Sequence, residues 1–133
     1  MKKIAVDTNI LVRLLARDDT AQWQIALKLL AENVLVVGST VLLETAWVLK
    51  SQFGYSQLTV AVLLNGLTEL DNLQFHEPDR VLKALDAFQA GMDFADALHV
   101  SLTGDGETFV TFDRDLARRA KQNIHHVSVE LAS

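Results

Sequence analysis

The fold is decided by residues 33–44, which read NVLVVGSTVLLE. The first half of this stretch, residues 34–37, is a largely β-branched apolar run between two turn-forming residues, and such runs are typical of a buried strand. The second half begins with Ser39 and Thr40, either of which can cap a helix, and the helical pattern continues to about Phe53. A strand that leads directly into a helix is the repeating unit of α/β folds.

The same alternation continues on both sides of this stretch. Short apolar runs predict four further strands, the last one at an edge: residues 4–6, 73–75, 108–111 and 126–129. Amphipathic patterns predict helices over residues 9–18, 20–32, 56–70, 78–89, 93–104 and 113–122. Strands that alternate with helices form parallel sheets, so we expect an α/β fold with a central parallel sheet and helices on both faces.

Length and composition bound the organisation of the chain. Its 133 residues are the size of about one domain, half of them are apolar, and we find no repeat or linker, so we expect a single domain over residues 1–133. The absence of cysteine excludes disulfide frameworks, zinc fingers, iron–sulfur sites and thiol chemistry. The first apolar run is too short for a signal peptide, and no uncharged run reaches the ~18 residues of a membrane span. We therefore expect a cytoplasmic protein without a membrane partner.

The charge balance is acidic, with 17 acids against 12 Lys and Arg and a net charge of −5. This does not favour binding of nucleic acid through a generally basic surface. It does not exclude a nuclease whose acids hold metal ions, because bound cations reverse the local charge.

Three acids, Asp7, Glu44 and Asp113, lie at or just past the carboxyl end of a predicted strand, which is where an α/β fold places its ligands. Asp7 and Asp113 follow predicted strands, whereas Glu44 and Asp96 lie among apolar residues in predicted helices. We expect the last two to be buried, and a buried carboxylate needs a cation or a metal. Carboxylates without Cys or a His pair suit Mg²⁺ or Mn²⁺, and such ions activate water for phosphodiester hydrolysis.

Each acid also has a simpler interpretation. An Asp at a helix start is a good N-cap, which applies to Asp7, Asp93 and Asp113. Asp93 and Asp96 together have the spacing of a capping box. Glu44 could pair with an arginine in the core.

Four motifs in order resemble the PIN domain, and together they cover essentially the whole chain. They are Asp7-Thr8-Asn9, the segment STVLLE at 39–44, the segment DFADALH at 93–99 and the segment TFDRDL at 111–116. The chain length, without additional domains, resembles the VapC group, the ribonuclease toxins of toxin–antitoxin pairs.

That resemblance implies a Rossmann-like parallel sheet, Mg²⁺ or Mn²⁺ as cofactor, and endoribonuclease activity on RNA. It also implies a homodimer and a small cognate antitoxin. Matched residue by residue, the catalytic and metal-binding acids are Asp7, Glu44, Asp96 and Asp113. The matching polar residues that support them are Thr8, Asn9 and Thr111.

Several nearby residues have open roles. His99 replaces an aliphatic residue of the family pattern, and we expect a core histidine rather than a ligand or base. Asp115 is expected to be a solvated acid favoured by the helix dipole. Arg13 and Arg17 could contact RNA or the antitoxin, or form a solvated face.

Other families fit less well. A receiver domain would need a second acid beside Asp7 and a Lys after its last strand, and an Asp-based phosphatase would need an acid where Asn9 stands. The alternative that remains is a PIN-like module that binds RNA or protein without cleaving it.

The predicted helix over residues 56–70 carries more apolar residues than one packing face uses: Val60, Ala61, Val62, Leu63, Leu64 and Leu67. Large exposed apolar patches are uncommon on soluble monomers, so we expect this helix to contact a second subunit or an antitoxin. The alternative is a crossover helix that buries all of them within one chain.

Overall fold

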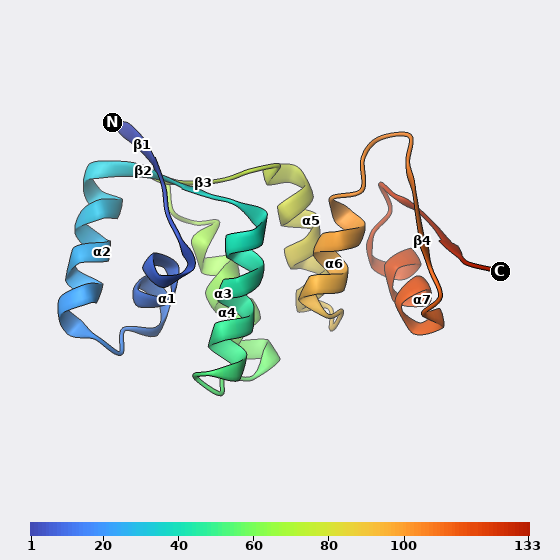
Figure 1. Cartoon of the computed structure of the whole chain (residues 1–133), viewed down its shortest axis with the longest axis horizontal. Helices are drawn as coiled ribbons and strands as arrows, with labels where there is room; N and C mark the ends of the chain where they lie inside the picture. Colours follow the sequence, from blue (N-terminus) through green and yellow to red (C-terminus); the bar gives the residue numbers. More distant parts are fainter. The chain divides into compact units, whose positions relative to one another are not determined.

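The computed structural model describes residues 1–133. The chain divides into two compact units, Met1–His76 and Glu77–Ser133 (Figure 1).

The N-terminal unit is built on a three-stranded parallel sheet. Its strands follow the order of the chain: β1 (Lys2–Ala5), β2 (Asn33–Val37) and β3 (Leu73–Phe75). Two helices connect each pair of strands: α1 (Thr8–Ala16) and α2 (Thr20–Glu32), then α3 (Ser39–Ser51) and α4 (Gln57–Leu67). Parallel neighbours need such crossover connections, because the chain must return to the starting end of the sheet before the next strand begins.

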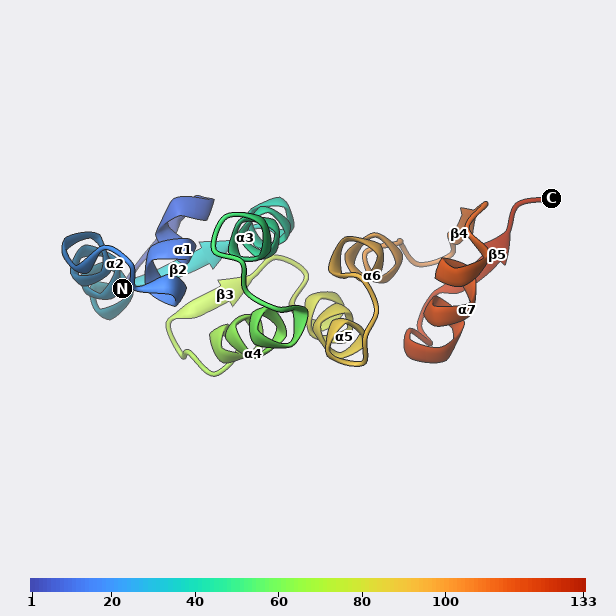
Figure 2. The same ribbon diagram turned by 90° about the horizontal axis from the view of Figure 1, so that it is seen from below.

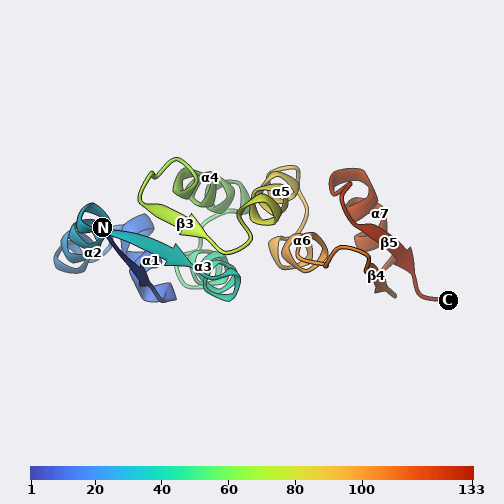
Figure 3. The same cartoon turned by 90° about the horizontal axis from the view of Figure 1, so that it is seen from above.

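All four helices lie on one face of this sheet (Figures 1 and 3). Crossovers between parallel strands are right-handed, so strands added in one direction place successive connections on the same face. Leu35, its register partner Leu73 and Val37 are buried. Lys3 and Gln74, at alternating positions, are exposed. This alternation fixes the register, because a one-residue slip would expose the apolar set.

The C-terminal unit combines a helix pair with a two-stranded parallel sheet. The helix pair is α5 (Pro78–Gln89) and α6 (Phe94–Ser101), which lie side by side (Figure 2), with the rings of Phe88 and Phe94 5.0 Å apart. Strands β4 (Thr108–Thr111) and β5 (Ser128–Leu131) pair directly and are connected through α7 (Arg114–Asn123).

The predicted α/β class with parallel strands is confirmed, and every predicted strand and helix is present. The prediction placed helices on both faces of the sheet, whereas the four helices of the N-terminal unit lie on one face of its sheet. The prediction differs from the structure in where some elements begin or end. Helix α4 ends at Leu67 and α6 at Ser101, three residues before the predicted ends. The last strand begins at Ser128 because this residue pairs with Thr108, whereas the prediction placed the strand over residues 126–129. None of the helices is both long and apolar enough to cross a bilayer.

Candidate active site

Asp7 and Glu44 are held close together in the N-terminal unit. Asp7 follows β1 and is the N-cap of α1, where its Oδ1 accepts a hydrogen bond from the Ile10 amide at 3.3 Å. The next residue, Thr8, donates a hydrogen bond from its hydroxyl to Oε1 of Glu44 on α3. The start of α1 is therefore linked to the middle of α3.

A cavity of about 320 Å³ opens between these residues. Two of its lining groups are carboxylates and two are amides, and the full lining is Asp7, Thr8, Asn9, Val12, Glu44, Val48 and Gln52. Oxygen ligands of this kind are those that Mg²⁺ and Mn²⁺ prefer.

The exposure of Glu44 corrects the expectation that it is buried. Helix α3 is not buried on every side. It buries one stripe, formed by Leu42, Thr45, Ala46 and Leu49, and leaves Glu44 and Trp47 outside that stripe. The interpretation of Glu44 as a core acid paired with an arginine is also wrong, since its partner is Thr8.

Gln52 is a lining residue that the sequence reasoning missed. It lies eight residues after Glu44 on the course of α3, and Val48 lies midway between them. Residues four apart share one face of a helix, so this spacing was the available signal.

In the C-terminal unit, two acids cap helices as the simpler interpretation predicted. Oδ2 of Asp93 accepts a hydrogen bond from the Asp96 amide at 3.0 Å, and Oδ1 of Asp113 accepts one from the Leu116 amide at 3.0 Å. The Thr111 hydroxyl accepts a hydrogen bond from the Asp113 amide at 3.0 Å and so orients the start of α7. Each cap uses one carboxylate oxygen and leaves the other available.

Asp96 is half-buried, and its surroundings are electronegative. Burial raises the pKa of Asp96, and the nearby charges of Asp93 and Asp113 raise it further, while His99 acts in the opposite direction. Like charges held close together favour a bound cation. His99 itself is exposed, so the expected core histidine is wrong.

Asp115 is committed to ion pairs within α7. Its carboxylate contacts Arg119 at 2.8 Å and also binds Arg118. Hydrogen bonds from Arg119 and then Arg118 lower the pKa of Asp115. Asp115 is therefore an exposed acid in the first turn of α7, as expected, and it is in addition paired within that helix.

Arg13 and Arg17 also have partners. Arg13 donates to both oxygens of Asp18 at 2.8 and 2.9 Å and to Gln22 at 2.5 Å. The Arg17 guanidinium lies 5.1 Å from the centre of the Trp23 ring.

The four candidate acids thus form two pairs, Asp7 with Glu44 in one unit and Asp96 with Asp113 in the other. None of the four forms an ion pair with Lys or Arg. Neither unit by itself gathers three or more His, Asp or Glu side chains into a metal-binding group.

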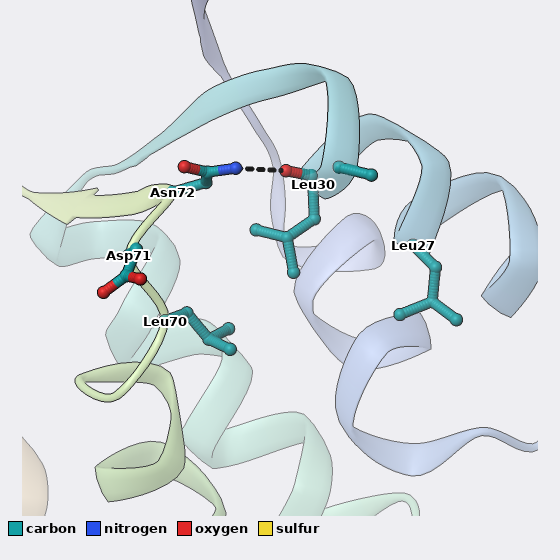
Figure 4. Close-up of a pocket in the computed structure, with 6 residues that line it drawn as sticks. Leu27, Leu30, Leu70, Asp71 and Asn72 are labelled. Atoms are coloured by element: carbon teal, nitrogen blue, oxygen red, sulfur yellow. Dashed lines mark hydrogen bonds between the residues drawn. The ribbon is translucent and has the colours of Figure 1, made fainter.

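Two other cavities have different linings. One of about 450 Å³ is mainly aliphatic and is lined by Leu27, Leu30, Ala31, Leu70, Asp71 and Asn72 (Figure 4). The Asn72 amide closes it by donating to the Leu30 carbonyl at 3.1 Å. Another of about 370 Å³ is lined by Lys83, Asn123, Ile124, His125 and His126. Neither offers the paired carboxylates found beside Thr8.

Comparison with known proteins supports the motif analysis. The family model for the PIN domain matches residues 4–122, a range that includes all four candidate acids. Searches of the curated proteins and of the solved structures found no match.

Proposed function

This chain belongs to the PIN domain family, and we propose that it is a Mg²⁺- or Mn²⁺-dependent endoribonuclease, the toxin of a VapC-type toxin–antitoxin pair. PIN domains are typically metal-dependent nucleases. The proposal is that this chain has the nuclease activity of the family and that its substrate is RNA.

The observation that carries the proposal is the pair of carboxylates in one polar cavity. Asp7 and Glu44 line this cavity, and neither has a cationic side chain as partner. Two uncompensated carboxylates are unfavourable together unless a cation joins them. The donor set therefore fits a hard divalent ion.

In this proposal, Asp7, Glu44, Asp96 and Asp113 hold the metal directly or through water. Thr8 fixes one Glu44 oxygen, and Thr111 orients the backbone at Asp113. When bound, Mg²⁺ or Mn²⁺ supplies an activated water and positive charge at the phosphate. The family resemblance implies a 5′-phosphate and a 3′-hydroxyl as the product ends.

The direct test is Asp7→Asn in a metal-dependent RNA cleavage assay. Asn also caps helices well, so the variant should fold, and its activity should fall by more than about 100-fold. Asp71→Asn is the matched control, because Asp71 is an exposed acid of the same unit that lines the aliphatic cavity. Cleavage by purified Asp7→Asn at the unaltered rate would refute the assignment.

A second variant tests whether both pairs of acids serve one reaction. Asp113→Asn keeps the cap of α7 and removes a carboxylate from the C-terminal unit. We expect the same loss as for Asp7→Asn, with no further loss in the double variant, because residues that act as a unit are not additive. Independent, additive losses would contradict the assignment of all four acids to one centre.

The toxin role and its partners need separate experiments. Induction in cells should arrest growth, and co-expression of a short protein encoded next to this chain should relieve the arrest. Sequencing of RNA ends after brief induction would identify the substrate. Exposed apolar side chains support both an antitoxin and a homodimer as partners: Ile25, Leu27, Trp47, Leu58 and Val62.

A PIN-like module that binds without cleaving remains the second candidate. It would bind RNA but show no metal-dependent cleavage in the assay above. The absence of any ion pair at the four acids favours the enzyme, since a purely structural acid in a polar cavity gains from a cationic side chain.

A further inference from the structure

Helix α7 carries an unusual share of the positive charge of this acidic chain. Four of the twelve Lys and Arg residues lie on its ten residues, together with one acid, Asp115. The remainder of the chain is correspondingly more acidic than its net charge of −5 indicates.

Three of these cations, Arg114, Arg118 and Lys121, form what we call the basic stripe. They are spaced four and three residues apart, so at 3.6 residues per turn they fall within one narrow face of the helix. The side chains of all three are exposed, whereas Ala117 and Ala120 of the same helix are buried. At a rise of 1.5 Å per residue the stripe is roughly 10 Å long.

Two members of the basic stripe have no partner within the fold. Arg114 and Lys121 form no ion pair, hydrogen bond or ring contact, and only Arg118 is paired, with Asp115. The other arginines of the chain are engaged: Arg13 with Asp18, Arg17 with Trp23, Arg80 with Asp105 and Arg119 with Asp115. An exposed cation without a partner is available to bind an external anion.

The stripe also begins at the candidate active site. Asp113 is the N-cap of α7, so Arg114 directly follows one of the four proposed metal ligands. A polyanion that reaches Asp113 therefore meets Arg114 first and then Arg118 and Lys121 one and two turns further along.

We propose that the basic stripe binds successive phosphates of the RNA strand that is cleaved, an inference that rests on the proposed function. Phosphate contacts position a strand without reading its sequence, and in polynucleotide binding each contact releases counterions. The stripe thus supplies the backbone affinity that the acidic remainder of the chain lacks. A solvated helix face would make no such contribution.

The test compares single-stranded RNA binding by the unaltered chain and by the double variant Arg114→Gln/Lys121→Gln. Neither change breaks an ion pair. Fluorescence anisotropy is recorded in EDTA over a range of KCl concentrations, so that metal-dependent cleavage does not remove the RNA. The matched control is Lys28→Gln/Lys50→Gln, which removes the same charge from two exposed lysines on other helices.

The affinity of a single strand varies with salt with a slope of about −0.7 per phosphate contact. Loss of two contacts should therefore reduce the slope by about 1.4 and weaken binding by roughly 25-fold at 0.1 M salt. The control variant should keep the unaltered slope.

Three results would overturn the inference. The first is no RNA binding by the unaltered chain at 0.1 M KCl, and the second is an equal effect of the control variant. The third is an unchanged RNA slope in the stripe variant with loss of binding to a protein partner, which would identify the stripe as a protein contact. Failure of the proposed function is distinguishable, because it appears as stripe-dependent binding without metal-dependent cleavage.

Discussion

The Thr8 hydroxyl donates a hydrogen bond to the Glu44 carboxylate and so joins the first residue of α1 to α3, 36 positions further along the chain. One oxygen of Glu44 is thereby held in place, while the carboxylate still faces the cavity that it shares with Asp7. Removing a hydrogen bond that orients a metal ligand typically weakens metal binding about 10- to 100-fold.

Thr8→Ala should weaken Mn²⁺ binding by about 10- to 100-fold, because Glu44 loses its orienting donor. Thr8→Ser keeps the hydroxyl and should bind Mn²⁺ like the unaltered chain. Calorimetric titration of both variants measures the difference. Ala is favourable in a helix, so a loss of helicity would not account for the result; equal Mn²⁺ affinity of the two variants would contradict the role of Thr8.

Asp96→Asn should raise the melting temperature near neutral pH in the absence of metal. The folded state raises the pKa of Asp96, so between the unfolded and folded pKa values the folded chain binds more protons, and its stability falls as pH rises. The Asn variant lacks this cost. Melting curves at about pH 7 and at about pH 3, below the unfolded pKa, measure it.

The two melting curves should differ at the higher pH and converge at the lower one, where the Asp96 carboxyl is protonated in both states. A lower melting temperature of Asp96→Asn at neutral pH would show that the acid stabilises the fold through a contact.

Asp115→Asn should tighten RNA binding, because it releases Arg118 from its ion pair and removes a negative charge beside the basic stripe. Anisotropy measured as above would detect the gain. The same change should lower the melting temperature slightly at neutral pH. The folded state lowers the pKa of Asp115, so its contribution is present above the unfolded pKa and is lost as pH falls.

Weaker RNA binding by Asp115→Asn would mean that Asp115 positions Arg118 and Arg119 for the strand rather than competing with it. A stability difference that persisted in strong acid would exclude the ion pairs as its cause.

Leu58→Glu/Val62→Glu should convert a homodimer to a monomer in analytical ultracentrifugation at micromolar concentration. Both side chains are more than half exposed, at 68% and 59%, and they lie one turn apart on α4. Two charges on this face would oppose its burial against a second copy. Leu82→Glu, at an exposed position on α5, is the control and should leave the oligomeric state unchanged. A chain that sediments as a monomer before any substitution would refute the dimer.

Most of the apolar residues that were singled out on α4 are buried within the single chain. Of the six residues singled out in the sequence, Val60, Ala61, Leu64 and Leu67 are buried, and only Val62 is exposed. A period-3.6 pattern identifies the buried face, but it does not state how many faces the surrounding elements cover.

The strands and helices could be predicted from the sequence because local signals mark them. Ser56 caps α4 and Asp113 caps α7, as expected for such residues before helical patterns. The division of the strands into a three-stranded and a two-stranded sheet could not be predicted, because hydrogen-bond partners depend on tertiary packing that no periodicity encodes.

At the candidate site, the positions of the acids in the fold were easier to predict than their burial and their partners. The position of Asp7 beyond β1 could be predicted, because Asp7 directly follows the apolar run of that strand. A cavity at this position could also be predicted, because α/β folds bind ligands beyond the ends of their strands. The exposure of Glu44 could not be predicted in this way, because successive side chains of a helix point about 100° apart, so apolar neighbours in sequence need not share the face of Glu44. The partners of Arg13 and Arg17 depended on side-chain contacts within and between α1 and α2, for which the sequence offered no signal.

The capping role of Asp7 and Asp113 bears on how such a protein can evolve. Each carboxylate performs a structural task that an amide performs equally well and a proposed chemical task that an amide does not. A single-base change in either codon is enough to replace Asp by Asn. The resulting chain would keep its helix starts and its basic α7. If the proposed activity holds, one mutation at either position would thus convert an RNA-cleaving enzyme into an RNA-binding protein without loss of stability.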